Sequence, residues 1–365
     1  MAGSLSLPDG ARLTAQNYLR AVRPSLDPVR LANERVLVTG ASGFIGTNLL
    51  EFYRGWGAGA VANFDIAAPR NPDHRDIWTK VDICDAAGVR AAMHGFRPTA
   101  VFHLAARADL IGKTAADYPE NSDGVRNVIA AMRELPNRPP LIVASSRMVC
   151  DIRHHPKNDT DYSAPNGYGQ SKVLTEIVTR RECGNSISWV LVRPTGVWGP
   201  WFDIPYRNFF DTVRRGLYMH PGEMRVRKSY QFVGNMVFQL DRLMFAGLAQ
   251  AQGHTLYVSD PPTEVLPWAR QIASAYGRRP PLTVPYPLLA AGAKIGDLLQ
   301  KLGWYNPPLT SFRLDNLTTD MMIDYMLAED VTGPVPYAME NAIAVTIDWL
   351  SQGIATAQKG QTGAA

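Results

Sequence analysis

Short apolar runs alternate with amphipathic segments from residue 35 to residue 199, and this alternation is the strongest constraint on the fold. The runs read RVLVTG, GAVANFD, WTKVDI, AVFHLAA, LIVASS and SWVLVRP. Between them, apolar residues recur at helical spacing, as Ile45, Leu49 and Tyr53 do in FIGTNLLEFYRG. Such a series predicts βαβ units with right-handed crossovers and a parallel sheet that is covered on both faces. We therefore expect an α/β fold with a doubly wound parallel sheet.

The alternation ends near Gly199, after which proline and aromatic residues become dense and strand-like runs become short. This change predicts a smaller, irregular region that covers the substrate. We expect an N-terminal extension at 1–34, the α/β core at 35–199 and a mainly substrate-binding region at 200–352, part of which returns to the core. The remaining residues, 353–365, have little to pack and are predicted to be a disordered tail.

Composition excludes several classes of protein. Of the 365 residues, 46% are hydrophobic and 19% are charged, and the net charge is only +4, which is too small an excess to favour nucleic-acid binding. The three cysteines are odd in number and lack CxxC spacing, which argues against a disulfide framework or a zinc site and fits a reducing cytoplasm. We also expect no secretion signal and no membrane-spanning segment.

The segment VTGASGFIG places Gly40, Gly43 and Gly46 between the first predicted strand and the first predicted helix. Glycines at such a turn allow backbone N–H groups to meet a pyrophosphate, which then faces the positive end of the helix dipole. The alternative is a purely structural turn, because glycines end many strands. The strand before the loop and the helix after it favour dinucleotide binding.

Two acidic residues follow the second and third predicted strands. Asp65 ends the run GAVANFD, where a carboxylate can accept hydrogen bonds from the ribose hydroxyls of adenosine and repel a 2′-phosphate. This position favours NAD over NADP. Asp82, in VDICD, lies where the amino group of an adenine could be bound. The alternative for both residues is a structural role, in which the carboxylate accepts hydrogen bonds from the backbone of its own loop.

Tyr168 and Lys172 lie one turn apart in NGYGQSKVLTE and hence on one face of the predicted helix. A tyrosine ordinarily titrates near 10, but an ammonium group and a nicotinamide cation beside the phenol would stabilise the phenolate, which could then act as a base. A serine at the end of a neighbouring strand would orient the substrate hydroxyl. Taken alone, a Tyr-x-x-x-Lys pair is more often a feature of a helix surface.

The glycine loop, Asp65, VFHLAA, the adjacent serines 145 and 146, Tyr168 with Lys172, and LVRPTGVWGP occur in this order. The combination resembles the extended short-chain dehydrogenase/reductase family, in particular its NAD-dependent nucleotide-sugar epimerase/dehydratase branch. The resemblance is dense from about residue 35 to residue 199 and looser afterwards. It implies an enzyme with a Rossmann domain that binds NAD and a smaller, irregular C-terminal region that binds the substrate.

The resemblance also assigns roles to single positions. Tyr168 matches the catalytic tyrosine, Lys172 the catalytic lysine and Ser146 the catalytic hydroxyl. Asn208 and Lys228 approximate positions that hold a nucleotide diphosphate in relatives, although the family usually has arginine where Lys228 stands. Cofactor contacts are implied for Gly40, Gly43, Phe44, Ile45, Gly46, Asp65, Asp82, Ile83, Leu104, Ala105, Ala106, Asn121, Tyr168, Lys172 and Pro194.

The two residues after Ser146 narrow the chemistry. Dehydratases of the family have an Asp–Glu pair there, which protonates the leaving hydroxyl and removes a carbon-bound proton. This chain has Arg147 and Met148, neither of which is an acid or a base at neutral pH. Decarboxylating relatives also usually keep an acidic residue at the position of Met148. The remaining chemistry is oxidation of a hydroxyl through Tyr168 and NAD, followed by reduction of the keto intermediate from its other face or by its release.

We therefore predict a cytoplasmic NAD-dependent 4-epimerase, an isomerase that acts on a nucleotide-diphospho-sugar. The rival enzyme is an oxidoreductase of the same superfamily, an NAD-dependent alcohol or 3β-hydroxysteroid-type dehydrogenase, because the half after Gly199 is rich in aromatic residues. Its segment PYPLLAAGAKIGDLLQKLGWY could touch a membrane or line an apolar pocket, although a core helix is the simpler interpretation. A non-catalytic NAD-binding protein is a third hypothesis, against which the three catalytic residues argue. Relatives commonly form dimers in which each subunit contributes two helices to a four-helix interface, and the corresponding helices of this chain are predicted at 117–134 and 165–182. We therefore expect a homodimer. We expect no metal ion in the site.

Overall fold

The computed structural model describes residue 5, residues 11–304, residue 307 and residues 309–362. The chain divides into two compact units. Unit 1 contains residues 1–202, 231–260 and 324–365, whereas unit 2 contains residues 203–230 and 261–323. Parts of the region predicted at 200–352 thus belong to each unit.

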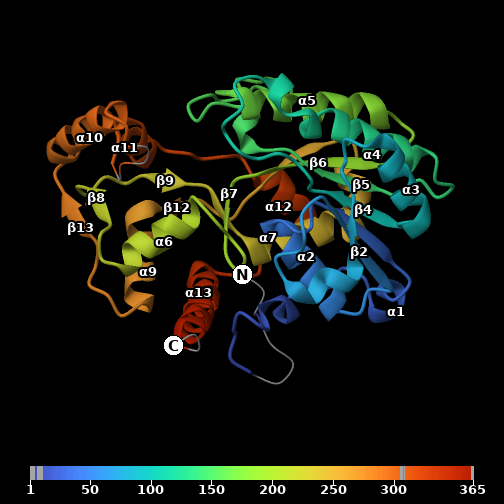
Figure 1. Cartoon of the computed structure of the whole chain (residues 1–365), viewed down its shortest axis with the longest axis horizontal. Helices are drawn as coiled ribbons and strands as arrows, with labels where there is room; N and C mark the ends of the chain where they lie inside the picture. Colours follow the sequence, from blue (N-terminus) through green and yellow to red (C-terminus); the bar gives the residue numbers. More distant parts are fainter. Residues whose placement is uncertain (1–4, 6–10, 305–306, 308, 363–365) are drawn as a thin grey trace. The chain divides into compact units, whose positions relative to one another are not determined.

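Unit 1 is built on a seven-stranded parallel sheet with the strand order β11-β6-β5-β4-β1-β2-β3 (Figure 1). The order reverses between β1 and β4, and ligands of open α/β sheets bind at the carboxyl ends of the strands beside such a switch point. The strands are β1 (Arg35–Thr39), β2 (Ala60–Asp65), β3 (Trp78–Lys80), β4 (Ala100–His103), β5 (Leu141–Ala144), β6 (Trp189–Pro194) and β11 (Thr255–Val258).

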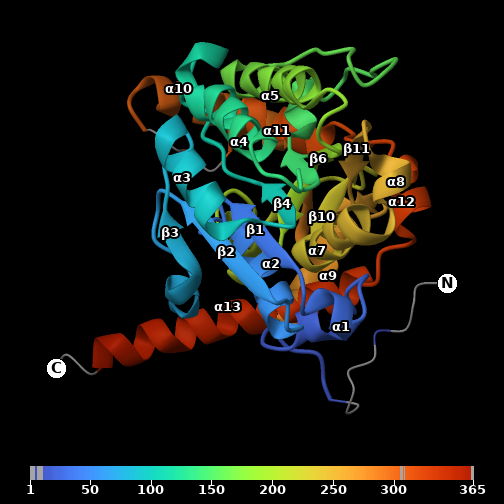
Figure 2. The ribbon, with the colours of Figure 1, turned by 90° about the vertical axis from the view of Figure 1, so that its right-hand side faces the viewer.

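Helices cover both faces of this sheet (Figure 2). On one face lie α3 (Ala86–Phe96), α4 (Asp123–Arg133) and α5 (Gly167–Cys183), which pack side by side, and on the other lie α2 (Phe44–Gly55) and α7 (Val233–Asp241). Coverage on both sides explains why β1 is apolar without alternation, with its residues 36–38 fully buried. The predicted doubly wound Rossmann fold is confirmed.

The N-terminal segment packs into unit 1 through a 3₁₀ turn, Tyr18–Ala21. Tyr18 is buried, its hydroxyl donates to Asn48 Oδ1 in α2, and its backbone oxygen accepts from the hydroxyl of Tyr337. These contacts tie residues from both ends of the chain to the face of the sheet that α2 covers. The other elements of this unit are α1 (Pro28–Leu31), β7 (Gly196–Trp198), α8 (Leu248–Ala251), α12 (Met326–Thr332) and α13 (Met339–Thr362).

Helix α13 extends into the segment 353–365 that was predicted to be disordered. Residues 363–365 lie outside the described part of the chain, and the disorder of this tail stays a prediction. Among the described residues, the search for a helix with the length and apolar character needed to cross a bilayer finds none.

Unit 2 combines helices with two small sheets. Strands β8 and β13 pair in parallel, and β9 and β12 pair antiparallel. Its aromatic core stacks Phe209 on Trp268 with ring centroids 4.7 Å apart. The elements are α6 (Tyr206–Arg214), β8 (Met219–Pro221), β9 (Arg227–Lys228), β12 (Thr263–Glu264), α9 (Val265–Ala275), β13 (Leu282–Val284), α10 (Tyr286–Lys301) and α11 (Ser311–Thr318), while β10 (Tyr230–Phe232) begins in this unit and continues into unit 1.

Candidate functional site

The glycine loop joins β1 to α2 and passes close to the end of β4. Gly40 has a φ of +71°, and a Cβ atom there would lie 2.5 Å from the backbone nitrogen of Ala105. A Cβ atom on Gly46 would lie 2.4 Å from Cα of Ala41. A larger side chain at either position would therefore force the loop away from the sheet or from its own turn. Helix α2 begins after Gly43. Because glycine has no side chain to cap the first turn, the first N–H groups of α2 are left uncapped and face the loop.

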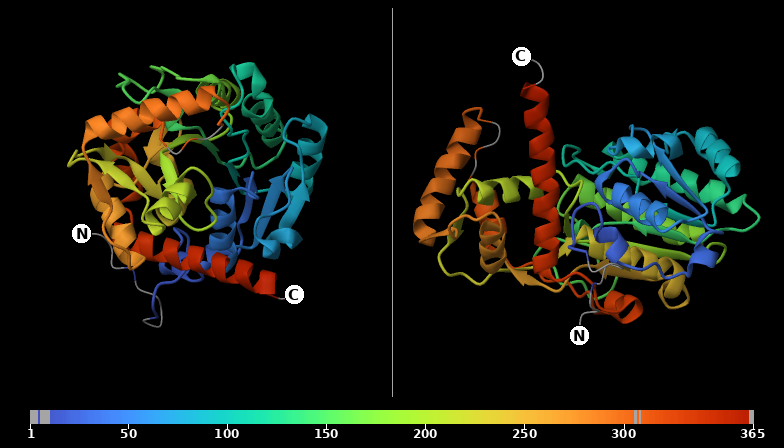
Figure 3. Two further views of the ribbon diagram at one scale, coloured as in Figure 1. Left: turned by 60° about the vertical axis from the view of Figure 1, so that its left-hand side comes forward. Right: turned by 90° about the horizontal axis from the view of Figure 1, so that it is seen from below.

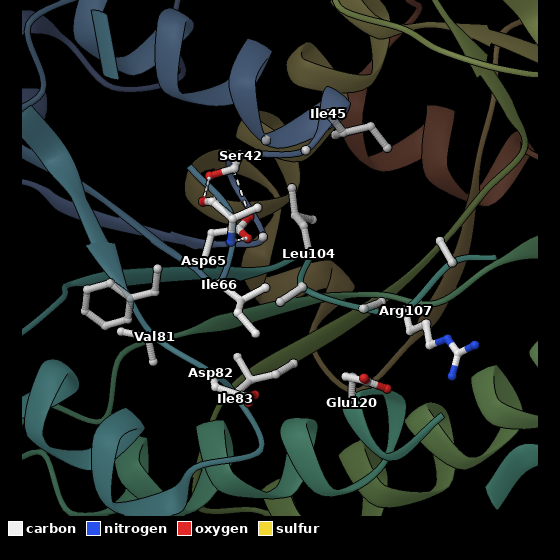
Figure 4. Close-up of a pocket in the computed structure, with 18 of the residues that line it drawn as sticks. Ser42, Ile45, Asp65, Ile66, Val81, Asp82, Ile83, Leu104, Arg107 and Glu120 are labelled. Atoms are coloured by element: carbon white, nitrogen blue, oxygen red, sulfur yellow. Dashed lines mark hydrogen bonds between the residues drawn. The ribbon is translucent and has the colours of Figure 1, made fainter. Parts of the chain in front are cut away.

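A cleft of about 720 Å³ opens at the carboxyl ends of β1, β2, β4 and β5 (Figure 4). Its wall contains most of the predicted cofactor residues, namely Gly40, Gly43, Phe44, Ile45, Gly46, Asp65, Asp82, Ile83, Leu104, Ala105 and Ala106. It also contains residues that the sequence analysis missed, including Ser42, Ile66, Arg70, Arg107 and Glu120. Ser42 could have been suspected, because it lies inside the glycine loop.

Asp65 holds the glycine loop as well as lining the cleft. Its carboxylate accepts hydrogen bonds from the backbone N–H groups of Ser42, at 3.0 Å, and Ala67, at 2.9 Å (Figure 4). The Ser42 hydroxyl in turn donates to the Ala67 oxygen at 2.7 Å. Asp82 similarly accepts from the N–H of Cys84 at 2.8 Å. Both aspartates thus make the loop contacts that were weighed as the alternative, and both still face the cleft.

Replacing Asp65 with asparagine should lower the ratio of NAD affinity to NADP affinity at least about tenfold. The amide is uncharged, so it no longer repels a 2′-phosphate, and it offers one oxygen instead of two to the ribose and the loop. Titration calorimetry with each dinucleotide measures the ratio. An unchanged ratio with both affinities equally weakened would show that Asp65 serves only to hold the loop.

The predicted catalytic residues meet where β5 ends and α5 begins. Ser146 starts the 3₁₀ turn Arg147–Val149 directly after β5, and its hydroxyl accepts from the N–H of Met148 at 3.1 Å. Tyr168 lies in the first turn of α5, where the Ser146 side chain is close enough to its phenol to lower the pKa of Tyr168. The edge of the Tyr118 ring packs against Tyr168, with centroids 6.1 Å apart. The structure therefore brings the phenol and the seryl oxygen together.

Lys172 lies one turn further along α5 and is buried. Its Nζ atom donates to the backbone oxygen of Ala144 at 3.0 Å, and Ala144 also lines the cleft. Burial lowers the pKa of Lys172 to about 8, despite an opposing effect from Glu176. Burial raises the pKa of Tyr168 above its usual value of about 10, and the hydrogen bond from Ser146 opposes this without cancelling it. The phenolate therefore needs more positive charge than the protein supplies.

The lowered pKa of Lys172 predicts a specific dependence of stability on pH. Between about pH 8 and 10.5 the unfolded chain binds this proton and the folded chain does not, so the free energy of unfolding should rise with pH relative to a Lys172→Met variant. The full difference is up to about 3 kcal/mol. Urea titrations at pH 7 and pH 10 of both proteins test it, with the exposed Lys80→Met as a control that should show no such trend. A difference in the free energy of unfolding between wild type and Lys172→Met that stays constant with pH would contradict a lowered pKa of Lys172.

Asn121 links two of the segments that carry the site. Its side-chain amide donates to Ser171 Oγ at 2.8 Å and to the Arg107 oxygen at 3.0 Å, and it accepts from the Arg107 N–H at 2.9 Å. It therefore ties the loop after β4 to α5 and is not among the residues that line the cleft. Pro194 ends β6 and is likewise outside that lining. A direct cofactor contact for these two residues stays a prediction.

The two predicted diphosphate-binding residues lie in unit 2. Asn208 is on α6, and Lys228 is buried on β9, where its Nζ atom donates to the backbone oxygen of Asn316 at 2.7 Å. Their role toward a substrate stays a prediction. Within the described part of the chain, no three histidine, cysteine or acidic side chains lie close enough together to hold a metal ion.

The cleft fits a dinucleotide on three grounds. The glycine loop is held in a tight turn at the start of α2 by close backbone approaches that only glycine allows at Gly40 and Gly46, and a pyrophosphate can meet the N–H groups of such a turn. Asp65 and Asp82 both line the cleft, where contacts with a ribose and an adenine stay predictions, and Ala144 connects the cleft to Lys172. The volume is in the range of cofactor pockets.

Comparisons with known proteins agree with this geometry. The chain is 26% identical to the N-acetyl-alpha-D-glucosaminyl-diphospho-ditrans,octacis-undecaprenol 4-epimerase of Escherichia coli O157:H7, over 87% of this chain and 95% of that protein. It is also 26% identical to a 3-beta-hydroxysteroid dehydrogenase of Mycolicibacterium neoaurum, over 68% of this chain and 70% of that protein. The fold resembles UDP-glucose 4-epimerase from Thermotoga maritima, with a TM-score of 0.67 and 18% identity over 87% of this chain and 99% of that chain.

A family model also matches the chain. Residues 36–226, just over half of the chain, match the family described as the NAD dependent epimerase/dehydratase family. This segment contains the glycine loop, both cleft aspartates and the Ser146–Tyr168–Lys172 group. The protein is therefore an enzyme that belongs to the NAD-dependent epimerase/dehydratase family.

Proposed function

We propose that the protein is an NAD-dependent nucleotide-sugar 4-epimerase. The observation that carries the proposal is the placement of Ser146 beside the phenol of Tyr168, whose pKa it lowers, one helical turn from the buried Lys172 and next to a turn whose first two residues are Arg147 and Met148. This group can move one hydroxyl proton. It has no carboxylate at positions 147 and 148 with which to eliminate water.

The protein's own residues have distinct tasks in this chemistry. Ser146 would orient the sugar hydroxyl toward Tyr168, and Tyr168 would take the hydroxyl proton and later return it. The ammonium of Lys172 would stabilise the phenolate through their proximity on one helix face. The glycine loop and Asp65 would hold NAD, which would supply reversible hydride transfer and, in its oxidised form, positive charge beside the phenol. Proton and hydride both return, so no net redox change occurs.

The choice among substrates is supported by the relatives. The Escherichia coli relative matches along nearly its whole length and is named as a 4-epimerase of a sugar joined through a diphosphate to undecaprenol, so it supports 4-epimerisation of a diphosphate-linked sugar. The nucleotide carrier is supported by the fold of the Thermotoga maritima protein, which is named as a UDP-glucose 4-epimerase. The 3β-hydroxysteroid dehydrogenase relatives of Mycolicibacterium neoaurum and Mycobacterium tuberculosis match over a smaller share of both chains. A 3β-hydroxysteroid-type dehydrogenase is therefore the weaker alternative, and it would require release of the oxidised product.

Incubation of the purified enzyme with UDP-glucose and with UDP-N-acetylglucosamine tests the proposal. We expect the 4-epimer of at least one sugar, detected by NMR, without accumulation of NADH. A parallel incubation with a polyprenyl-diphospho-sugar identifies the group that carries the sugar. Turnover of that substrate alone would show that the carrier is a lipid and not a nucleotide, while the reaction would still be a 4-epimerisation. Stoichiometric NADH with a keto product, or turnover of a hydroxysteroid, would overturn the epimerase proposal.

We also propose that the protein forms a homodimer through α4 and α5. The two helices pack side by side, and Leu174 and Ile177 of α5 are exposed by 36% and 44%. Pairing this face with a second copy would bury both side chains in a four-helix bundle. Replacing both residues with glutamate should convert the dimer to a monomer, as measured by light scattering after gel filtration. A wild-type monomer, or a dimer that survives both changes, would refute the assignment.

We propose the cytoplasm as the compartment of this activity. Cys84 is exposed, and Cys150 and Cys183 are buried, and all three are free thiols. Such a set is compatible with a reducing environment. Cell fractionation with an activity assay tests the location, and recovery of the activity from an oxidising compartment would contradict it.

A further inference from the structure

Helix α10 of unit 2 has one buried face. Leu289 and Ala293 pack against Leu314 of α11 in a small hydrophobic core. Gly296, on the same face, lies so close to the next segment that a Cβ atom would be 1.7 Å from the Leu309 oxygen. These contacts fix which side of α10 faces the unit and which side faces outward.

The outward face of α10 is also apolar. Leu288, Ile295, Leu298 and Leu302 follow a heptad-like spacing and are exposed by 64%, 60%, 57% and 75%. Figure 3 shows α10 (orange) along its length. A surface helix of a soluble domain normally turns polar residues to water, and a continuous exposed apolar stripe marks a surface that binds something.

Aromatic and basic residues frame this stripe. Tyr286 at the start of α10 and Trp304 just beyond its end are exposed by 47% and 53%. Lys294 and Lys301 are exposed on α10 itself. Residues 278–316 contain five basic and two acidic residues. One of the two acidic side chains, Asp297, accepts the N–H of Ser311 at the start of α11 and is thereby directed toward that helix.

We propose that this outward face of α10 docks on an anionic membrane surface. A helix with an apolar stripe, flanking lysines and aromatic ends suits the boundary between headgroups and acyl chains, where lysine side chains reach the headgroups. Its 16 residues would lie in the plane of the bilayer over about 24 Å. A second copy of the chain fits less well, because it would bring Lys294 and Lys301 toward the same positive charges.

Sedimentation of the full-length protein with lipid vesicles tests this docking. We expect binding to vesicles of phosphatidylcholine with phosphatidylglycerol, weaker binding at high salt, and little binding to phosphatidylcholine alone. Replacing Ile295 and Leu298 together with glutamate should weaken binding more than about tenfold. Both side chains are exposed, so the variant should fold and keep its activity on a nucleotide sugar.

A matched control is Leu327→Glu on α12 of unit 1, a residue exposed by 54%, which should bind vesicles like the wild type. Lys294→Glu with Lys301→Glu should remove the preference for phosphatidylglycerol. Absence of vesicle binding by the wild type, or undiminished binding by the Ile295/Leu298 variant, would overturn the proposal. So would a soluble dimer that this variant dissociates, since the occupant would then be a second copy of the chain. The docking is independent of the proposed epimerase activity, because vesicle binding decides it whether or not the protein turns over a nucleotide sugar.

Discussion

Replacing Tyr168 with phenylalanine should lower kcat by about a thousandfold while NAD affinity changes little. The variant keeps the ring that packs against Tyr118 and loses only the phenol oxygen beside Ser146. In the proposed mechanism, that oxygen takes the sugar proton and later returns it. Because Tyr168 is outside the lining of the cleft, the glycine loop and Asp65 remain available to the dinucleotide.

The measurement needs two readouts and one control. Single-turnover kinetics report the chemical step, and calorimetric titration reports NAD affinity. Tyr276→Phe is a matched control in unit 2, since its buried hydroxyl has no hydrogen-bond partner among the described residues and its removal should leave kcat unchanged. Turnover of Tyr168→Phe within tenfold of the wild type would remove the tyrosine from the mechanism. A parallel loss of NAD binding would instead indicate a misfolded cleft.

The pattern of apolar runs was sufficient to predict the architecture of unit 1. Six of its seven strands lie in the runs identified between residues 35 and 199, because strands buried on both faces need continuous apolar sequence. The seventh, β11, comes from residues after the break and could not be assigned to this sheet by local pattern. The burial of Tyr18 could not be predicted from the local sequence either, because it depends on Asn48 and on Tyr337, which are distant in sequence.

Spacing also predicted which catalytic side chains share a helix, but not their electrostatics. One turn of α5 separates Tyr168 from Lys172, so their common face followed from sequence alone. The pKa values did not follow, because burial acts in opposite directions on a phenol and an ammonium group. Burial raises the pKa of Tyr168 and lowers that of Lys172, whereas the sequence had suggested only a stabilised phenolate. The carbonyl of Ala144 that holds Lys172 comes from another strand.

The sequence analysis also missed a buried ion pair behind the site. Glu176 lies one turn after Lys172 and is fully buried, and its two carboxylate oxygens accept from Arg193 Nε at 2.7 Å and Nη2 at 2.8 Å. The same carboxylate accepts from the hydroxyls of Ser145, at 2.6 Å, and Tyr162, at 2.9 Å. Burial alone would lower the pKa of Arg193, but its hydrogen bonds with Glu176 raise it above the usual value. The pair therefore joins α5 to β6 and to the end of β5.

Replacing Glu176 with alanine should lower the free energy of unfolding by about 3–5 kcal/mol. The cost arises because the guanidinium of Arg193 stays buried without its carboxylate, and because the Ser145 and Tyr162 hydroxyls lose an acceptor. Urea denaturation measures the change. Asp76→Ala breaks the exposed pair with Arg54, whose Nη1–Oδ1 distance of 2.9 Å is similarly short, and should cost less than about 1 kcal/mol.

A double replacement, Glu176→Leu with Arg193→Met, separates the cost of an unpaired charge from the cost of lost packing. Apolar residues of similar volume leave no buried charge, so the double variant should be more stable than Glu176→Ala. Equal destabilisation of all variants would show that shape, and not charge, matters at this position. Should Glu176→Ala cost no more than Asp76→Ala, the pair would not hold α5 in place. The position of Tyr168 and Lys172 would then have to depend on Asn121 and the contacts of the α5 N-terminus.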